Sequence, residues 1–256
     1  MKKVDISLLI LFPILAFLIT IFCKTNLFTS VFLFFGVSSV YLIIRNKKIF
    51  LKSFYFSFLL SIPLSLFFDT LAALDKSWIV PHSIFPFRFF GLATVEVYTL
   101  GFLWVLLTVL FYEHFLEKTK KEKIVDRGMR YLHIICAVLT LIVLIAWLFN
   151  SVEMLTVPYI YFWFSVILTC LLVIFLYFYP KLLQKFILAG IYFFFVTFLL
   201  EIAALHNGQW IFPGTHYIGF VEIFKYKFPI EEFVFWMMLC TPIVLAFYEF
   251  FDDDRK

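Results

Sequence analysis

The sequence contains few of the residues and motifs with which proteins bind metals, nucleotides or diphosphates. It has 4 cysteines in 256 residues and no CxxC pair, so we interpret each cysteine as a small core residue. There is no HxxxH or HxxHH motif, which argues against a di-iron hydroxylase or desaturase, and no GxGxxG loop for a dinucleotide. The aspartates at 252–254 form a polar tail rather than a DDxxD motif for Mg²⁺ and a prenyl diphosphate. We therefore expect no cofactor and no metal ion.

Charged residues are also scarce, at 15% of the chain, whereas hydrophobic residues make up 64% and phenylalanine alone occurs 39 times. A water-soluble domain of this length could not bury so much apolar surface. A helix needs about 20 residues to cross the hydrocarbon core of a bilayer. Apolar runs near that length occupy residues 6–23, 27–44, 50–68, 93–116, 131–149, 157–179, 183–205 and 229–250. The sequence therefore predicts an all-α, polytopic bundle of about eight transmembrane helices.

The basic residues predict how these helices are oriented. In this topology 16 of the 21 lysine and arginine residues lie on the side that carries both termini. Because cytoplasmic loops are enriched in lysine and arginine, we expect both termini to be cytoplasmic, in a bacterial-type inner or plasma membrane. The net charge of +4 then reflects orientation, and it gives no reason to expect nucleic acid as a partner. Membrane lipid is the expected surrounding, and a homo-oligomer is left open.

Two passages of the chain, 69–81 and 201–213, resemble each other. An acidic residue, a Trp-Ile pair and a proline recur in both at an offset of 132. The matched residues are Asp69 with Glu201, Trp78 with Trp210, and Pro81 with Pro213. Duplicated acidic and aromatic residues in a membrane chain predict a two-halved site, because the interface between repeats is where such proteins bind small molecules.

Further matches follow at an offset of 136. They pair Glu96 with Glu232, and Tyr112-Glu113 with Tyr248-Glu249. We interpret the two Tyr-Glu pairs as anchors at the cytoplasmic ends of helices. Together the matches predict two parallel four-helix repeats, residues 1–120 and 131–256, joined by a basic cytoplasmic linker at 121–130.

The acidic residues are the first candidates for chemistry. Asp69 and Glu201 would end the third helix of each repeat, while Glu96 and Glu232 would open the fourth, with Glu231 beside Glu232. The helix dipole favours acids at a helix N-terminus, which would give them a purely structural role. Duplicated acids in a membrane segment otherwise poor in acids instead indicate a functional site, because ionisable groups at membrane depth are costly. A carboxyl group that apolar surroundings keep neutral can protonate a carbon–carbon double bond.

The aromatic residues near these acids are candidates for substrate binding. Trp78 and Trp210 would serve in packing or at the membrane interface, or stabilise a developing carbocation by about 1–2 kcal/mol when desolvated. His206 would act as a base or hydrogen-bond Glu201, and Phe233 directly follows the acidic pair.

Two long loops, at about 69–92 and 206–228, are rich in proline and aromatic residues. Such apolar loops are expected to fold back over the helix ends rather than extend into water. They are therefore predicted to close an apolar cavity.

The duplicated four-helix layout, the loop tryptophans and the Pro-x-Glu-Glu-x-x-Phe sequence at 229–235 together resemble the small membrane-integral lycopene cyclases. That family has two halves, which are separate polypeptides in some members and fused in others. The resemblance covers nearly the whole of this chain, as a fused form. The first half departs from the pattern, since Ala93 replaces the proline and Val95 the first glutamate, so that only Glu96 is kept.

This resemblance implies that the substrate is lycopene or a related linear carotenoid. Its linear ends would be closed to β-type rings by proton-initiated, redox-neutral cyclisation, in which no cofactor takes part. Together with the reading of the residues above, the candidate catalytic residues are Glu232, Glu231, Glu201, Asp69 and Glu96, and the candidate substrate-binding residues are Trp78, Trp210, His206 and Phe233.

Two other functions stay open. One is a different membrane terpenoid cyclase that acts on another polyene. The other is a non-catalytic carrier or channel for a lipid or ion, which would need a polar path that the spans are expected to lack. The sequence leaves undecided whether β, ε or γ rings form, whether one or both ends are cyclised, which repeat is active and which acid donates the proton.

Overall fold

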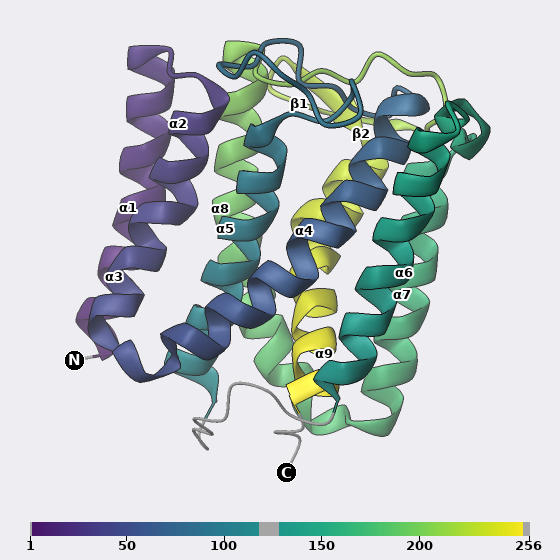
Figure 1. Cartoon of the computed structure of the whole chain (residues 1–256). Coiled ribbons are helices and arrows are strands. Elements are labelled where there is room, and N and C mark those ends of the chain that lie inside the picture. Colours follow the sequence, from purple (N-terminus) through teal and green to yellow (C-terminus); the bar gives the residue numbers. More distant parts are fainter. Residues whose placement is uncertain (1, 118–127, 253–256) are drawn as a thin grey trace.

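The computed structural model describes residues 2–117 and 128–252, and this part of the chain forms a helical bundle (Figure 1). Eight helical segments are long and apolar enough to cross a membrane, which confirms the predicted all-α bundle and indicates an integral membrane protein. These segments are Lys2–Cys23, Leu27–Arg45, Lys47–Leu74, Val95–Leu116, Met129–Leu148, Ile160–Phe178, Pro180–Asn207 and Glu232–Phe251. Most of the predicted linker, 121–127, lies outside the described residues.

Several spans are composed of more than one helical element. The α-helices are α1 (Lys2–Cys23), α2 (Leu27–Val31), α3 (Val37–Arg45), α4 (Phe50–Leu74), α5 (Val95–Phe111), α6 (Met129–Leu148), α7 (Ile160–Phe178), α8 (Leu183–Asn207) and α9 (Cys240–Asp252). Three π-helices continue them, η1 (Phe32–Gly36), η3 (Tyr112–Leu116) and η6 (Glu232–Leu239). The 3₁₀-helices are η2 (Lys47–Ile49), η4 (Val152–Leu155) and η5 (Pro180–Leu182).

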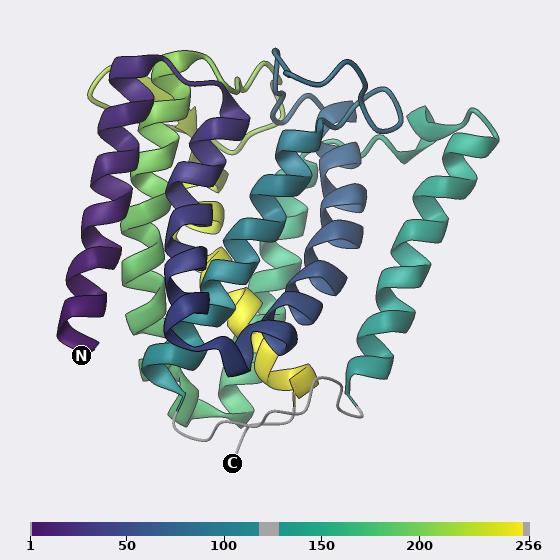
Figure 2. The same cartoon turned by 60° about the vertical axis from the view of Figure 1, so that its left-hand side comes forward.

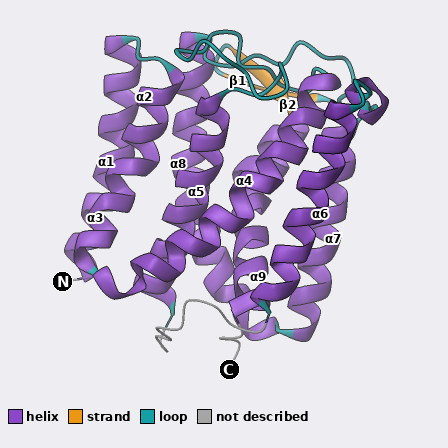
Figure 3. Cartoon of the chain, in the orientation of Figure 1, coloured by secondary structure: helices purple, strands orange, loops and turns teal. Residues whose placement is uncertain are grey.

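The two ends of the bundle differ in structure. The start of α1 and the end of α9 lie together at one end, which we call the terminal end (Figure 1). At the opposite end, the loop end, the long loops lie across the helices (Figure 3). The second loop also contains an antiparallel hairpin of β1 (Phe220–Ile223) and β2 (Tyr226–Pro229), which the apolar pattern of the sequence did not predict.

The core of the bundle is built around α5. Thirteen of its 17 residues are buried, and it packs against α4, α3, α9 and α8. A helix that is apolar on all sides is stable only when it is surrounded, which explains its central place. By contrast, only five of the 20 residues of α6 are buried, and this helix stands at the edge of the bundle (Figure 2). Its exposed leucine and isoleucine side chains suit contact with lipid.

Two buried hydrogen bonds cross between segments far apart in the sequence at the terminal end. The Tyr112 hydroxyl donates to Glu249, and the Tyr248 hydroxyl donates to Glu113. All four side chains are buried. The two Tyr-Glu pairs therefore bond to each other in a reciprocal way and join η3 to α9, instead of acting as two separate anchors at helix ends.

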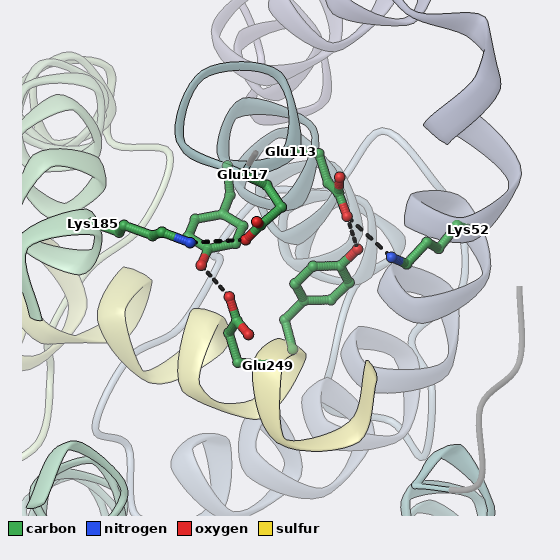
Figure 4. Close-up of polar contacts among 7 residues, drawn as sticks. Lys52, Glu113, Glu117, Lys185 and Glu249 are labelled. Carbon is green, nitrogen blue, oxygen red and sulfur yellow. Dashed lines mark hydrogen bonds and ion pairs between the residues drawn. The ribbon is translucent and has the colours of Figure 1, made fainter. Parts of the chain in front are cut away.

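Two lysines complete this network (Figure 4). The Lys52 ammonium lies 3.2 Å from Oε1 of Glu113, and that of Lys185 lies 2.9 Å from Oε2 of Glu117. Lys52 is only 3% exposed. A buried charge is tolerated when it is paired and hydrogen-bonded, so these contacts link α4 to η3 and α8 to the residue that follows η3.

A second buried acid lies near the start of the chain. Asp5 of α1 accepts hydrogen bonds from the Tyr41 hydroxyl at 2.6 Å and the Arg45 guanidinium at 3.1 Å, both on α3. The His114 ring of η3 lies 3.0 Å from its other oxygen. These contacts join α1 to the rest of the bundle at the terminal end.

The reciprocal bonds give a first prediction. Tyr248→Phe removes the donor to a buried carboxyl group and should lower the free energy of unfolding by about 1–3 kcal/mol. Tyr177→Phe is the control, because Tyr177 is 82% exposed on the outer surface. Thermal unfolding in detergent measures both variants, and equal melting temperatures would contradict a stabilising role of the crossed bond.

Candidate functional site

A cavity lies between α4, α5, α7 and the segment formed by η6 and α9. Its empty volume, part of which is open at the surface, is about 970 Å³. It extends from the acidic residues near the loop end to Leu60 and Phe247, nearer the terminal end. Apolar and aromatic side chains form most of its wall, and the two acidic residues that line it are Asp69 and Glu232. Such a cavity suits a long apolar molecule that meets a few acidic groups at one end.

Glu232 is at the first position of η6 and is almost fully buried. The Tyr161 hydroxyl of α7 donates a hydrogen bond to its Oε2. Its carboxyl group also lies within hydrogen-bonding reach of Glu201 on α8. Two ionised carboxylates this close would repel each other in apolar surroundings, so a proton on either one would relieve the repulsion. The pair is therefore a candidate for proton transfer at the cavity wall.

Glu201 itself is fully buried and does not line the cavity. The indole N–H of Trp210 donates to its Oε1 over 3.1 Å. Its Oε2 receives no hydrogen bond from the described residues. Glu201 therefore lies behind Glu232, next to the cavity but outside its wall.

Asp69 reaches the cavity from the other side, near the end of α4. It contacts the side chains of Ser65 and Trp78, both of which line the cavity. Trp78 in turn meets Trp210 edge-to-face, with their ring centroids 6.0 Å apart. The two sequence-matched tryptophans thus lie together, each beside the acid that precedes it in the chain.

The other two predicted catalytic acids bind loops. Glu96 accepts hydrogen bonds from the Ser83 hydroxyl at 2.9 Å and from the Ile84 N–H at 2.8 Å. Glu231 accepts one from the Ile218 N–H at 2.8 Å. Neither acid lines the cavity. Both acids thus bind the backbone of a loop. Glu96 therefore resembles Glu231 in its contacts, although the sequence match pairs it with Glu232.

Two of the predicted substrate-binding residues lie away from the cavity. His206 is exposed at the end of α8, and its Nδ1 is 2.8 Å from the Tyr226 hydroxyl. Phe233 packs against Phe194 and Phe228. Neither is among the residues that line the cavity. In the part of the chain that the structure describes, no three His, Cys, Asp or Glu side chains are grouped so that they could hold a metal ion.

The sequence did not single out several residues of the cavity wall. Tyr161, Trp104, Trp236 and Phe235 all line it, and the rings of Trp104 and Trp236 lie 4.8 Å apart. These residues belong to apolar runs in which aromatic side chains are frequent, so no local motif distinguishes them. The predicted acidic cluster gave an indication of Tyr161 alone, because a buried carboxyl group needs a hydrogen-bond donor beside it.

The two long loops are bonded to each other above the cavity. Ile79 and Ile211 form a short antiparallel bridge with two backbone hydrogen bonds of 2.9 Å. The Tyr217 hydroxyl donates to the Ser77 carbonyl at 2.8 Å, and burial raises the pKa of Tyr217, which keeps that donor protonated. Oδ1 of Asp75 lies 2.6 Å from Nδ1 of His216. The loops therefore form a single cap.

No protein-family model, curated protein or solved structure matches the chain. The arrangement of residues in the cavity and the motif resemblance are thus the basis for any functional conclusion.

The cap gives a second prediction. A Cβ atom at Gly214 would lie 2.8 Å from the Lys76 carbonyl oxygen, which is backbone and cannot move aside easily. Gly214→Ala should therefore separate the loops and lower the free energy of unfolding by about 1–3 kcal/mol. It should also speed proteolysis in the segment 208–231.

Gly190→Ala is the matched control, because its Cβ would meet Pro242 at an ordinary 3.6 Å. Equal proteolysis of the two variants would contradict a cap that depends on this close approach.

Proposed function

We propose that the protein is a cyclase of the lycopene type, which closes the linear ends of a carotenoid into rings, with β rings the first expectation. The observation that carries this proposal is the pair of acids, Asp69 and Glu232, on two walls of a cavity otherwise lined mainly by apolar and aromatic residues. Proton-initiated cyclisation needs one acid, one base and an apolar space between them.

The chemistry would proceed in three steps. The carboxyl group of Glu232, which shares a proton with Glu201, protonates the terminal double bond of the substrate. A second double bond of the same molecule then attacks the cation, a carbon–carbon bond forms, and the ring closes with a tertiary cation. Asp69 finally removes a ring proton, which restores a double bond. One proton enters and one leaves, so no electrons are transferred.

The aromatic residues would stabilise the cation. Trp78, Trp210 and Tyr161 line the cavity beside the acids. A cation over a desolvated tryptophan face gains about 1–2 kcal/mol. The Tyr161 hydroxyl also fixes the Glu232 carboxyl group and keeps its reactive oxygen in one place.

We also propose that the two halves of the chain are related by duplication. The Trp78–Trp210 contact and the Ile79–Ile211 bridge join sequence-matched positions, and the reciprocal Tyr-Glu bonds join one matched Tyr-Glu pair to the other. The loop contacts of Glu96 and Glu231 favour matching these two residues at an offset of 135. On that match Val97, which lines the cavity, stands where the second half has Glu232. The proton donor would then come from the second half alone.

The orientation proposed from the basic residues places the terminal end in the cytoplasm and the cap on the opposite side of the membrane. The substrate would enter the cavity from the lipid, because a carotenoid is dissolved in the bilayer.

One observation favours a second function, that of a carrier or channel. Ser57 and Ser61 are buried in the middle of α4, although the spans were expected to lack polar residues at that depth. A polar line inside a membrane protein is also typical of transport. A cyclase acting on another polyene stays the third possibility, and the product of the reaction separates all three.

The direct test is expression in a host that accumulates lycopene, followed by chromatography of the pigments. We expect cyclic carotenoids with the wild-type chain and none with Glu232→Gln, because the amide cannot donate the proton. Glu222→Gln is the control, since Glu222 is exposed in β1. Normal cyclic product from Glu232→Gln would remove Glu232 as the donor, and unchanged lycopene with the wild type would favour a carrier.

A further prediction concerns cofactors. The purified, detergent-solubilised protein should cyclise lycopene without added flavin, nicotinamide or metal, and EDTA should not reduce its activity. The reason is that proton-initiated cyclisation has no net redox change. Activity that appears only after addition of reduced flavin would overturn this prediction and would make the cofactor, rather than Glu232, the stabilising or acidic group.

A further inference from the structure

A second, smaller pocket lies beneath the first long loop, beside the cavity described above. We call it the loop pocket. Its empty volume, part of which is open at the surface, is about 280 Å³. Three residues, Asp69, Trp78 and Val97, line both the loop pocket and the cavity. Asp69 therefore lies between two hollows, one among the helices and one under the loop.

The loop pocket reaches the surface at the loop end of the bundle. Arg88 and Leu92 of the first loop line it, and both are half-buried. The Arg88 guanidinium donates hydrogen bonds of 2.8 to 3.2 Å to three backbone carbonyl groups of this loop, those of Val80, Pro81 and Leu92. A guanidinium has five N–H donors, so others remain for water. One wall of the pocket is thus positively charged and partly solvated.

A buried hydroxyl group in the wall of the loop pocket lacks a protein partner. Thr94 directly precedes α5, lines the pocket and is 0% exposed. A threonine at this position usually accepts a hydrogen bond from the first turn of its helix. The Thr94 hydroxyl does not cap α5, and it has no partner among the described residues. A buried hydroxyl without a partner indicates a ligand that hydrogen-bonds to it.

A second hydroxyl near Asp69 has the same property. Tyr98 lies one turn after Thr94 on α5, and it is close enough to Asp69 to interact with its charge. Its hydroxyl also has no partner among the described residues, although only 7% of the residue is exposed. Two unused hydroxyl groups from neighbouring turns of α5 therefore lie on the side of Asp69 that the loop covers.

The matched acid of the second half lies in different surroundings. Glu201 is fully buried and lines neither the cavity nor the loop pocket. The sequence match at an offset of 132 pairs Ala73, which lines the loop pocket, with Leu205. Because Ala73 follows Asp69 by four residues, the two are neighbours on the surface of α4. The small alanine leaves space beside Asp69 that a leucine would fill.

Space, polar groups and an opening to the surface together identify water as the ligand. One water molecule takes up about 30 Å³ in the liquid and needs about two to four polar partners. The loop pocket offers the Asp69 carboxyl group, the Thr94 hydroxyl and the Arg88 guanidinium. We propose that the loop pocket holds water that exchanges protons between Asp69 and the solution at the loop end.

The use of this exchange rests on the proposed function. When a ring closes, the proton of Glu232 becomes part of a C–H bond, and Asp69 removes a proton from another C–H bond. The O–H bond of Asp69 then breaks, its proton passes to water in the loop pocket, and Asp69 is again a carboxylate. Glu232 takes an equivalent proton from water, so that no net proton is consumed.

The test follows the exchange of the Asp69 proton for deuterium. The full-length protein is reconstituted in lipid at a pH at which infrared spectra show the carbonyl band of protonated Asp69, which is identified by its loss in Asp69→Asn. The buffer is then changed to D₂O, and the rate at which this band shifts is measured.

Ala73→Leu places the residue of the second half in the loop pocket. We expect it to slow the exchange by about tenfold, which corresponds to about 1.4 kcal/mol, because leucine displaces the water beside Asp69. Ala137→Leu is the matched control, since Ala137 is exposed on α6, which does not border the loop pocket. Equal rates in the wild type and Ala73→Leu, or the same slowing in both variants, would overturn the proposal and leave the pocket a gap in the packing.

A second measurement detects the water without filling the pocket. The 4 native cysteines are replaced by alanine, and Ala73→Cys is introduced into this chain. A charged thiol reagent that does not cross membranes is added at the loop end and should modify this cysteine. The control is a chain that keeps Cys240 alone, because Cys240 lines the apolar cavity but not the loop pocket. Modification of Ala73→Cys no faster than that of Cys240 would contradict a water-filled pocket.

Neither readout depends on cyclisation. Exchange slowed by Ala73→Leu in a protein that makes no cyclic product would support the loop pocket as the route and refute the proposed function. Exchange unchanged by Ala73→Leu in an active cyclase would do the reverse.

Discussion

The cost of burying a carboxyl group in hydrocarbon determines much of how the helices of this bundle are arranged. Each membrane-buried acid is held by a donor from another part of the chain, so that the acids also fix which helices are neighbours. Asp5 joins α1 to α3 through Tyr41 and Arg45, and Glu113 joins η3 to α9 through Tyr248. An apolar contact between such helices would be worth little in lipid, because lipid tails are equally apolar. The polar contacts therefore provide specificity that hydrophobic burial cannot.

At the loop end the same constraint has a chemical result. The acids at the cavity are satisfied only in part, since Glu201 and Glu232 lie beside each other and Asp69 faces an open cavity. At the terminal end Glu113 is paired with an ammonium group as well as a hydroxyl. Glu113 thus has a cation beside it, whereas none of the described lysine and arginine residues lines the cavity. This contrast supports the proton transfer that we propose for the cavity.

The sequence was sufficient for the spans and for the cluster of acids, because both depend on local composition. Hydropathy locates the eight segments, and duplication draws attention to Asp69, Glu201 and Glu232. The sequence could not reveal that Glu96 and Glu231 bind loops. An acid at the start of a helix has the same sequence pattern whether its carboxyl group meets an N–H group or a cavity.

The π-helix η6 accounts for a discrepancy between the two halves. The loop-binding acids Glu96 and Glu231 are 135 residues apart, but the crossed tyrosines Tyr112 and Tyr248 are 136 apart. A π-helical turn is an α-helix with one inserted residue, and η6 lies between the second acid and the second tyrosine. Without that residue α9 would turn by about 100°, and Tyr248 would no longer face Glu113. On the proposed duplication, a single inserted codon would have been enough to bring the reciprocal bonds into register while Glu231 kept its contact with the loop.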